Sequence, residues 1–258
     1  MSDPVMFETD GRQATVTVRR PDSLNALSTT VHDQLYEAFD SLEDDILAVR
    51  LRSAGTKAFV AGADLDEIHG MSLEEFKQFQ WNSRQTIDAI EAHPAVVIAE
   101  VTGLAYGGGC ELALASDIVV ADEDARFAVP EVTLGLVPGG GATQRLPRIV
   151  GPNKAKEMLT TGDPISGSTA HTYGLVNHVI DEPGAVEERA KSIADSIAEN
   201  APLAVREGKR LVDEGLEASL PTGLSYEQEV TFTLYQTEDA KEGIQAFAED
   251  REPSFRGE

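Results

Sequence analysis

Two glutamates stand in apolar or glycine-rich surroundings and could carry out proton transfer. Residues 105–115 surround Glu111, and residues 127–137 surround Glu131. A carboxylate in apolar surroundings tends to have a raised pKa, which suits it to exchange protons near neutral pH. Taken singly, each could instead be an exposed loop or helix-start residue, because the helix dipole favours acids near a helix N-terminus. Together they are candidates for a general acid and a general base.

Two glycine clusters accompany these acids and could stabilise an anion. Gly107–Gly109 directly precedes a helical pattern that begins at Cys110, and Gly139–Gly141 precedes another. Glycine lets a ligand approach the backbone closely, and free N–H groups at a helix start suit a phosphate or a developing oxyanion. The spacing matches neither the G-x-G-x-x-G dinucleotide fingerprint nor a P-loop. For the first cluster taken alone, tight packing of a turn is the alternative interpretation.

Other site chemistries lack their sequence signals. No CxxC or HExxH motif is present, and no G-x-S-x-G elbow for a serine nucleophile. Cys110 has no histidine nearby in sequence, so we expect a small buried residue there. We therefore predict no metal site. We expect surface or satisfied polar residues at the histidines, which lack metal-ligand spacing: His32, His69, His93, His171 and His178.

Short strands lead into the candidate site. Ala95–Val101 reads as a strand that precedes the first glycine cluster, and Phe127–Val129 as a strand that ends just before Glu131. A third strand begins at Phe59 and enters a turn of small residues that ends at Asp64. Strands are thus expected directly before the first glycine cluster and before Glu131.

Local signals punctuate the rest of the chain. Asp10-Gly11 predicts a hairpin turn, and Ser28 is expected to cap a helix with apolar residues at helical spacing. Ser72 with Glu75 forms a capping-box pattern for a helix that reaches about Ala92. Asn153 is expected to cap a later helix.

Strands alternate with helices to about residue 180, and helices dominate after it. This order predicts an α/β core followed by a helical C-terminal part. From Val186 onward the helical pattern is broken at Pro202 and Pro221. We predict a core domain over residues 1–200 and a helical C-terminal region over residues 201–258.

Composition is that of an ordinary globular protein with few signals of export. The chain has 258 residues, 41% of them hydrophobic, and no apolar run approaches the length of a membrane span. A single cysteine cannot form an intrachain disulfide, and the first ten residues lack the pattern of a secretory leader. We therefore expect a cytoplasmic protein.

The charge balance is strongly acidic. The formal net charge is −24, from 45 acidic and 21 basic residues. Nucleic acid and anionic membranes are poor partners for such a surface. The acids are scattered rather than gathered in a tail, so solubility is one explanation. Adaptation to a salt-rich cytoplasm, which screens self-repulsion, is the sharper hypothesis.

The ordered set of motifs resembles the enoyl-CoA hydratase/isomerase (crotonase) family over nearly the whole chain. No single motif is decisive, but their order is specific. The matching segments are Pro21 with Asn25–Leu27, Lys57–Leu65, Gly103–Ala113, Phe127 with Pro130-Glu131, Leu134-Gly135, Pro138–Gly141, Thr143–Leu146, Thr161-Gly162, Glu242–Phe247, and Arg251 with Pro253 and Phe255.

The resemblance implies a fold and an assembly. It implies a crotonase-like superhelix of ββα turns, followed by helices that mediate trimerisation, with a homotrimer or a dimer of trimers as the assembly. It also implies an acyl-CoA thioester as substrate, with no separate cofactor.

The resemblance also implies roles for particular residues. The backbone N–H groups of Ala63 and Gly108 would form an oxyanion hole, and Glu111 and Glu131 would hold the catalytic water. Contacts with CoA or with the pocket boundary are implied for Lys57, Ala61, Ala63 and Gly139. Asp66 departs from the pattern, because many hydratases carry there a lysine that helps to bind the CoA phosphates.

We therefore predict an enoyl-CoA hydratase, since family isomerases often keep only the second of the two glutamates. Dehydration of a 3-hydroxyacyl-CoA in the reverse direction and double-bond isomerisation are the close alternatives. A non-catalytic scaffold or RNA-binding member is the more distant one, and no lysine-rich helix supports it. The wall that sets acyl length is expected within Ile68–Trp81, where Met71, Phe76, Phe79 and Trp81 could equally be core.

Overall fold

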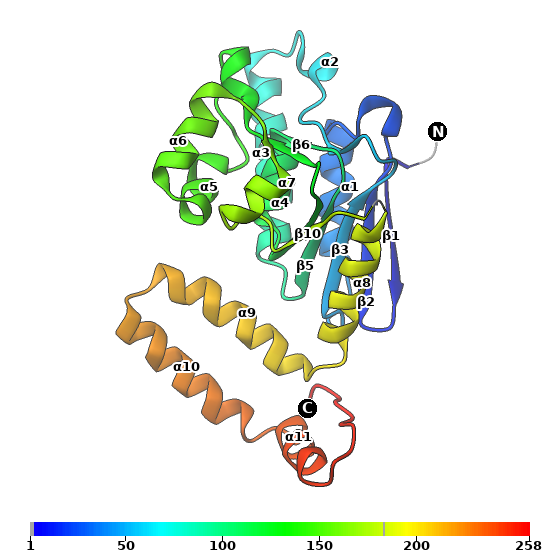
Figure 1. Cartoon of the computed structure of the whole chain (residues 1–258), viewed down its shortest axis with the longest axis vertical. Helices are drawn as coiled ribbons and strands as arrows, with labels where there is room; N and C mark the ends of the chain where they lie inside the picture. The colour runs from blue at the N-terminus through cyan, green and yellow to red at the C-terminus, as the bar shows by residue number, and fades with distance from the viewer. Residues whose placement is uncertain (1–2, 183) are drawn as a thin grey trace.

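Two twisted sheets carry the first part of the chain in the computed structural model, which describes residues 3–182 and 184–258 (Figure 1). Met1, Ser2 and Pro183 lie outside the described residues, and with them the start of the segment examined for a leader. Within the described ranges, the larger sheet has the order β1-β2-β3-β5-β7-β10 and the smaller has β4-β6-β8-β9. The larger sheet comprises β1 (Val5–Asp10), β2 (Gln13–Val18), β3 (Ala48–Ser53), β5 (Val96–Val101), β7 (Ile118–Asp122) and β10 (His178–Ile180). The smaller comprises β4 (Ala58–Val60), β6 (Leu104–Tyr106), β8 (Arg126–Ala128) and β9 (Ile165–Ser166).

The two sheets arise from one repeated path of the chain. In β3–β4, β5–β6 and β7–β8, the first strand joins the larger sheet and the second joins the smaller one. A helical segment follows each pair and returns the chain to the larger sheet, so successive strands pair in parallel. The expected ββα superhelix is therefore confirmed. Two short strands, β6 and β9, were not predicted from the sequence. The first directly precedes the glycine cluster at Gly107, and the second has two residues, which are too few to show alternation.

The helices of the core lie around these sheets. Their bounds are α1 (Thr29–Asp40), α2 (Leu65–Ile68), α3 (Leu73–Glu91), α4 (Gly108–Ala115), α5 (Ala142–Val150), α6 (Pro152–Thr161), α7 (Gly167–Thr172) and α8 (Ala185–Ala198), with 3-10 turns η1 (Pro21–Ser23) and η2 (Pro130–Leu134). Ser28 caps α1, and Ser72 with Glu75 forms the predicted capping box of α3. The prediction that Asn153 caps α6 was wrong. Gly151 is the N-cap residue there, because Pro152 takes the first helical position and moves Asn153 inside the first turn.

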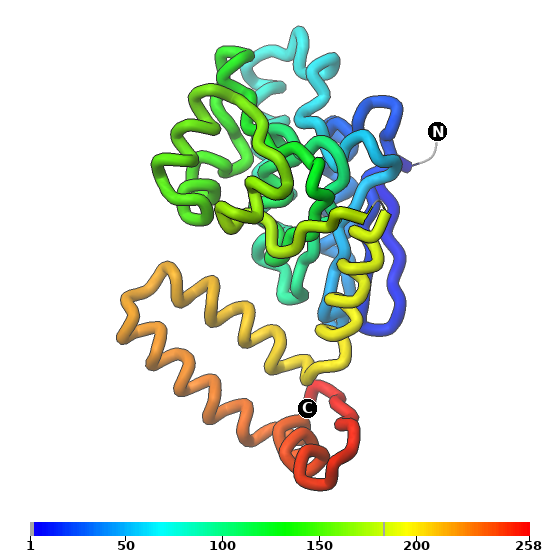
Figure 2. Tube along the Cα trace, in the orientation of Figure 1, coloured from blue at the N-terminus to red at the C-terminus, as the bar shows by residue number. Residues whose placement is uncertain are grey.

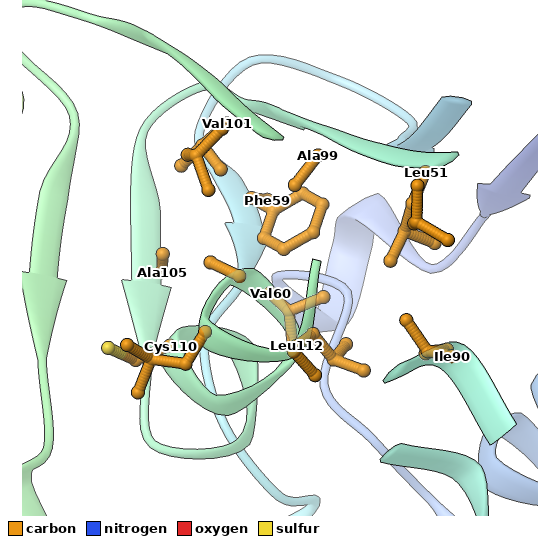
Figure 3. Packing of buried hydrophobic residues seen from close by; sticks show 14 of the residues in the cluster. Leu51, Phe59, Val60, Ile90, Ala99, Val101, Ala105, Cys110 and Leu112 are labelled. Carbon is orange, nitrogen blue, oxygen red and sulfur yellow. The ribbon is translucent and has the colours of Figure 1, made fainter. Parts of the chain in front are cut away.

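Apolar side chains fill the space between the sheets and the helices. Figure 3 shows Phe59 of β4 among Leu51, Ala99 and Val101, with Leu112 of α4 nearby. The predicted burial of Cys110 is confirmed, since its side chain is fully buried in this core. On the other face of the larger sheet, α8 forms a second, smaller core with Ala48, Ile98 and Val120.

The C-terminal helices extend away from the core. They are α9 (Pro202–Glu217), α10 (Leu220–Leu234) and α11 (Glu238–Ala248), and Figure 2 shows α9 and α10 running back along one another. Lys209 of α9 anchors them to the core, because its Nζ donates to Asp117 at 2.7 Å and to the Ala95 carbonyl at 3.1 Å. The predicted helical C-terminal region is confirmed. The predicted domain division at residue 200 stays a prediction.

Gly109 is required for the packing of α4 on β4. A Cβ at this position would lie 2.0 Å from the Val60 carbonyl oxygen, which is backbone and cannot rotate away. We expect Gly109→Ala to lower the free energy of unfolding by about 3 kcal/mol, as overpacking does in a tight core. Urea unfolding measures this change.

Gly208 provides the matched control for this substitution. It lies within α9 with nothing within 4 Å of a built Cβ. Gly208→Ala should stabilise the chain by about 0.5–1 kcal/mol through helix propensity. Equal urea midpoints for wild type and Gly109→Ala would contradict the role given to Gly109.

Candidate active site

A cavity of about 160 Å³ lies where the ends of the smaller sheet meet α3 and the start of α4. It brings together six of the seven residues predicted for the site, from four separate stretches of the chain. They are Ala61, Ala63, Gly108, Glu111, Glu131 and Gly139. The apolar part of the lining comes mainly from Leu27, Leu65, Ile68, Phe76, Phe79, Leu134, Leu136 and Val137.

Two backbone N–H groups beside this cavity are available to a ligand. Among residues 3–182 and 184–258, no protein acceptor pairs with the N–H of Ala63 or of Gly108. Gly108 is the first residue of α4, so its N–H lies among those that a helix leaves unsatisfied. Ala63 follows β4 and forms an isolated bridge with Leu27, whose carbonyl accepts from the next residue, Asp64. The cavity can therefore offer two backbone donors to a ligand.

Glycine is needed at the turn that presents these donors. Gly107 has φ +51° and ψ −119°, a conformation that L-residues with a side chain rarely adopt. A Cβ there would also lie 3.0 Å from Oε1 of Glu131. The turn therefore brings the backbone close to that carboxylate, which a larger residue would prevent.

Glu111 is buried and held by backbone amides. Only 3% of its surface is exposed, and the Ala142 N–H donates to its Oε1 at 3.0 Å. Burial raises the pKa of Glu111, while the amides of Ala142, Gly140 and Gly141 and the charge of Arg145 oppose that rise. A Cβ on Gly140 would lie 2.6 Å from its Oε2, so the second glycine cluster makes room for this carboxylate.

Glu131 can be protonated near neutral pH. Burial, with the charge of Glu111 as a smaller contribution, raises the pKa of Glu131 from 4.5 to about 7. Its Oε2 is buried and has no hydrogen-bond partner within the described part of the chain. An uncompensated carboxylate oxygen favours the protonated form, which can donate a hydrogen bond or a proton. The site can thus hold a protonated Glu131 near neutral pH, beside a second carboxyl group at Glu111.

Lys57 is the predicted site residue that the structure keeps apart from the others. It is exposed and lines a separate surface depression with Pro21, Gly55 and Thr56. Its carbonyl oxygen approaches Gly103, where a Cβ would lie 2.2 Å away. Its assignment to CoA binding stays a prediction.

Several lining residues were not singled out from the sequence. Leu136 and Val137, which lie between η2 and α5, line the cavity and are exposed. They share no periodic pattern that could have marked them. Of the residues expected to set acyl length, Phe76 and Phe79 line the cavity, whereas Trp81 is 66% exposed and does not.

The expectation that every histidine is exposed or satisfied was wrong for His32. Its side chain is 1% exposed, lines the cavity and has no partner for Nδ1 among the residues described. Burial lowers the pKa of His32 to about 4, so the ring is neutral near pH 7. Its place on the buried face of α1, with Val31 and Leu35, was the signal available in the sequence.

Residues 3–182 and 184–258 lack two features that would indicate other functions. They contain no group of three or more histidine, cysteine, aspartate or glutamate side chains placed to hold a metal ion. Nor does any helix there have the length and apolar character needed to span a bilayer.

The amino-acid sequence matches a known family over nearly its whole length. The model of the enoyl-CoA hydratase/isomerase family matches residues 8–258. The chain therefore belongs to this family. It is an enzyme of the hydro-lyase class. Its relatives support enoyl-CoA hydration as the activity at the level of the family.

Individual relatives agree over almost their full lengths. A short-chain-enoyl-CoA hydratase of Clostridium acetobutylicum is 41% identical over 249 residues, which are 96% of this chain and 95% of that protein. A crotonyl-CoA hydratase of Syntrophomonas wolfei is 37% identical over 253 residues, 97% of each. The crystal structure of an enoyl-CoA hydratase from Bacillus anthracis superposes with a TM-score of 0.96 at 38% identity, covering 99% of this chain and 100% of that one.

Proposed function

We propose that this protein hydrates a short-chain 2-enoyl-CoA to the 3-hydroxyacyl-CoA. The observation that carries the proposal is the meeting of four groups in one apolar cavity. They are two N–H groups that have no acceptor within the described part of the chain, the buried carboxylate of Glu111 and the partly buried carboxylate of Glu131. Hydration needs an electrophilic site for the thioester oxygen, a base for water and an acid for Cα. This cavity offers a candidate for each.

The oxyanion is assigned to the N–H groups of Ala63 and Gly108. Attack of water at Cβ moves electrons through the conjugated system and leaves negative charge on the thioester oxygen as an enolate. Donors aimed at that oxygen stabilise the transition state more than the ground state, and each is typically worth about 3–4 kcal/mol. The small residues at this turn let the thioester approach the backbone.

The proton transfers are assigned to the two glutamates. We assign Glu111 to accept a proton from the attacking water and Glu131 to donate a proton to Cα. The raised pKa of Glu131, about 7, supports its role as the donor, because the protonated form is populated at neutral pH. The two carboxyl groups interact, so their titration belongs to the pair.

The size of the cavity favours a short acyl chain. Its volume is about 160 Å³, and an engineered cavity of about 150 Å³ accommodates benzene. The names of the two bacterial relatives, short-chain-enoyl-CoA hydratase and crotonyl-CoA hydratase, point to the same size class. We therefore take crotonyl-CoA as the first substrate to test.

Loss of the conjugated-thioester absorbance of crotonyl-CoA tests this function. Wild type should remove the absorbance and yield 3-hydroxybutyryl-CoA, and the reverse reaction should dehydrate that product through the same groups. A chain that leaves crotonyl-CoA unchanged, or that only shifts the double bond of a 3-enoyl-CoA, would overturn the proposal. The presence of both glutamates favours hydration over isomerisation.

Asp66 is expected to weaken the binding of the polyanionic CoA. It is exposed on α2 next to Leu65, which lines the cavity, and the whole chain carries −24. We expect Asp66→Lys to lower the KM for crotonyl-CoA by about 2–5-fold, and added salt to lower the KM of wild type. Steady-state kinetics across a salt series measure both effects.

A substitution of equal charge elsewhere is the control for Asp66. Glu8→Lys alters the exposed edge strand β1 and changes the net charge by the same amount. If it lowers KM as much as Asp66→Lys does, the effect is one of net charge. If KM in wild type rises or stays constant with salt, the repulsion argument fails, and so does the kinetic part of the salt-adaptation hypothesis.

Assembly through the C-terminal helices is part of the proposal. These helices expose large apolar side chains, including Leu216, Leu220, Phe232, Tyr235 and Phe247, each more than half exposed. A surface of this kind is typical of an interface between copies. We therefore keep a homotrimer or a dimer of trimers as the proposed assembly.

The cytoplasmic location stays a prediction.

A further inference from the structure

Three uncharged polar side chains interrupt the apolar wall of the cavity, and the proposed chemistry uses none of them. Gln80 and Ser83 of α3 and His32 of α1 all line it. Phe76, Phe79, Gln80 and Ser83 follow one another at helical spacing, so they form one face of α3. The edge of the His32 ring meets Phe79 with ring centroids 5.4 Å apart. The polar groups and the apolar wall are therefore one continuous surface.

Within the described part of the chain these three side chains form no hydrogen bond with protein, and Nδ1 of His32 is buried without a partner. His32 is 1% exposed and Ser83 is 6% exposed, so bulk water reaches little of either side chain. A buried polar group without a partner is unfavourable, and such groups are retained where something else binds them. The side chain of Thr86, one turn beyond Ser83, instead donates to the His32 carbonyl at 3.0 Å and holds α1 against α3.

The chemistry of the wall selects a neutral partner. The lining contains no lysine or arginine, so a carboxylate would be desolvated without a counter-charge beside two glutamates. Neutral imidazole offers one donor and one acceptor, and the serine hydroxyl and glutamine amide each offer both. A hydroxyl group, which also donates and accepts, complements them.

We propose that the enzyme selects 2-enoyl-CoA substrates whose short acyl chain carries a hydroxyl group beyond Cβ, which His32, Ser83 and Gln80 bind. The proposal rests on the hydratase function proposed above and specifies its substrate. Gln80 also lies beside the second glycine cluster, since a Cβ on Gly139 would be 2.1 Å from its Oε1. The α3 face thus extends from Gly139 to His32.

Two pairs of substrates of equal size test this proposal. The first is trans-4-hydroxybut-2-enoyl-CoA against trans-pent-2-enoyl-CoA, and the second is trans-5-hydroxypent-2-enoyl-CoA against trans-hex-2-enoyl-CoA. In at least one pair we expect kcat/KM to be about 10-fold or more higher for the hydroxylated member, because the analogue leaves buried polar groups unpaired. Equal values within both pairs would mean that the wall holds only water, and would overturn the proposal.

His32→Leu is the informative variant, because leucine is apolar and of similar size. It should abolish the preference for the hydroxylated substrate and raise kcat/KM for the apolar one. It should also raise the Tm by about 2–4 °C or more, since an unpartnered buried nitrogen is removed. Retained preference would overturn the proposal. A lower Tm would show that Nδ1 is satisfied in the folded protein, which also counts against it.

Ser83→Ala and His171→Leu complete the set. Ser83→Ala removes one hydroxyl without adding volume and should reduce the preference even if His32→Leu does not fold. His171 is an exposed histidine of α7 outside the cavity, so His171→Leu should keep the preference of wild type. Crotonyl-CoA in the same assay separates the two proposals. If it is not hydrated, the hydratase function fails, and if it is hydrated without any hydroxyl preference, only this inference fails.

Discussion

Glu131→Gln is expected to lower kcat for crotonyl-CoA hydration by about 10²–10⁴-fold. Glutamine keeps the size of the side chain but cannot donate the proton that Cα requires. Glu111→Gln is expected to have an effect of the same order, because the attacking water then lacks its base. The rate at which crotonyl-CoA loses its conjugated-thioester absorbance measures kcat for both variants.

The pH dependence of wild type should report Glu131. Its pKa is about 7, so the proton needed at Cα is lost as the pH rises through that value. We therefore expect kcat/KM for hydration to fall on the alkaline side of about pH 7, and this limb to be absent from the residual activity of Glu131→Gln. A flat profile from pH 6 to 9 would contradict the assignment.

Stability distinguishes loss of chemistry from loss of fold. The pKa of Glu131 is raised from 4.5 to about 7 on folding, so the folded chain binds the proton more tightly than the unfolded chain. Its contribution to stability is fully present below pH 4.5 and is lost as the pH rises through 7. Glu131→Gln should therefore be more stable than wild type at pH 8. An inactive variant that is also less stable at pH 8 would point to misfolding instead.

Gly108→Pro is expected to lower kcat by about 10²–10³-fold, the usual effect of removing one oxyanion donor. Proline has no N–H, and Gly108 occupies the first position of α4, where proline is best tolerated. The substitution thus removes the proposed donor and leaves the helix in place. Kinetics with crotonyl-CoA and circular dichroism of the variant give the two readouts.

Gly108→Ala is the matched control for the missing donor. It adds the same Cβ, which would lie 2.8 Å from Cδ1 of Leu27, but keeps the N–H. That contact is with the end of a flexible side chain, so we expect a loss of only about 10-fold or less. If alanine and proline reduce kcat equally, the loss is steric and Gly108 is not an oxyanion donor.

The site combines two features that oppose stability. Two carboxylates are held in an apolar cavity, and the strained turn at Gly107 brings the backbone next to one of them. The second glycine cluster repeats this pattern, since a Cβ on Gly140 would meet Glu111. Close approach of backbone to carboxylate is the property that a small, preorganised acid–base site requires. The carboxylate oxygens beside Gly107 and Gly140 thus explain why these two positions have no side chain.

Local sequence determined most of the helices and strands and identified the candidate site residues. Hydroxyl caps at Ser28 and Ser72, the hairpin turn at Gly11 and the buried strands follow from neighbouring residues alone, because capping and alternation are local interactions. The order of motifs along the chain was enough to indicate the family. Asn153 shows where local rules compete, since the proline before it set the helix start.

Only the tertiary structure decided which of these residues share a cavity. Glu111 and Glu131 are 20 positions apart and Ala63 lies on another repeat, and their meeting depends on how successive ββα turns stack. The same stacking left Lys57 outside and sealed His32 within the wall. Burial and the pKa values that follow from it are properties of the packed molecule, because every side chain around a residue contributes to its solvation. The amino-acid sequence thus identified the groups capable of the chemistry, and the fold determined their surroundings.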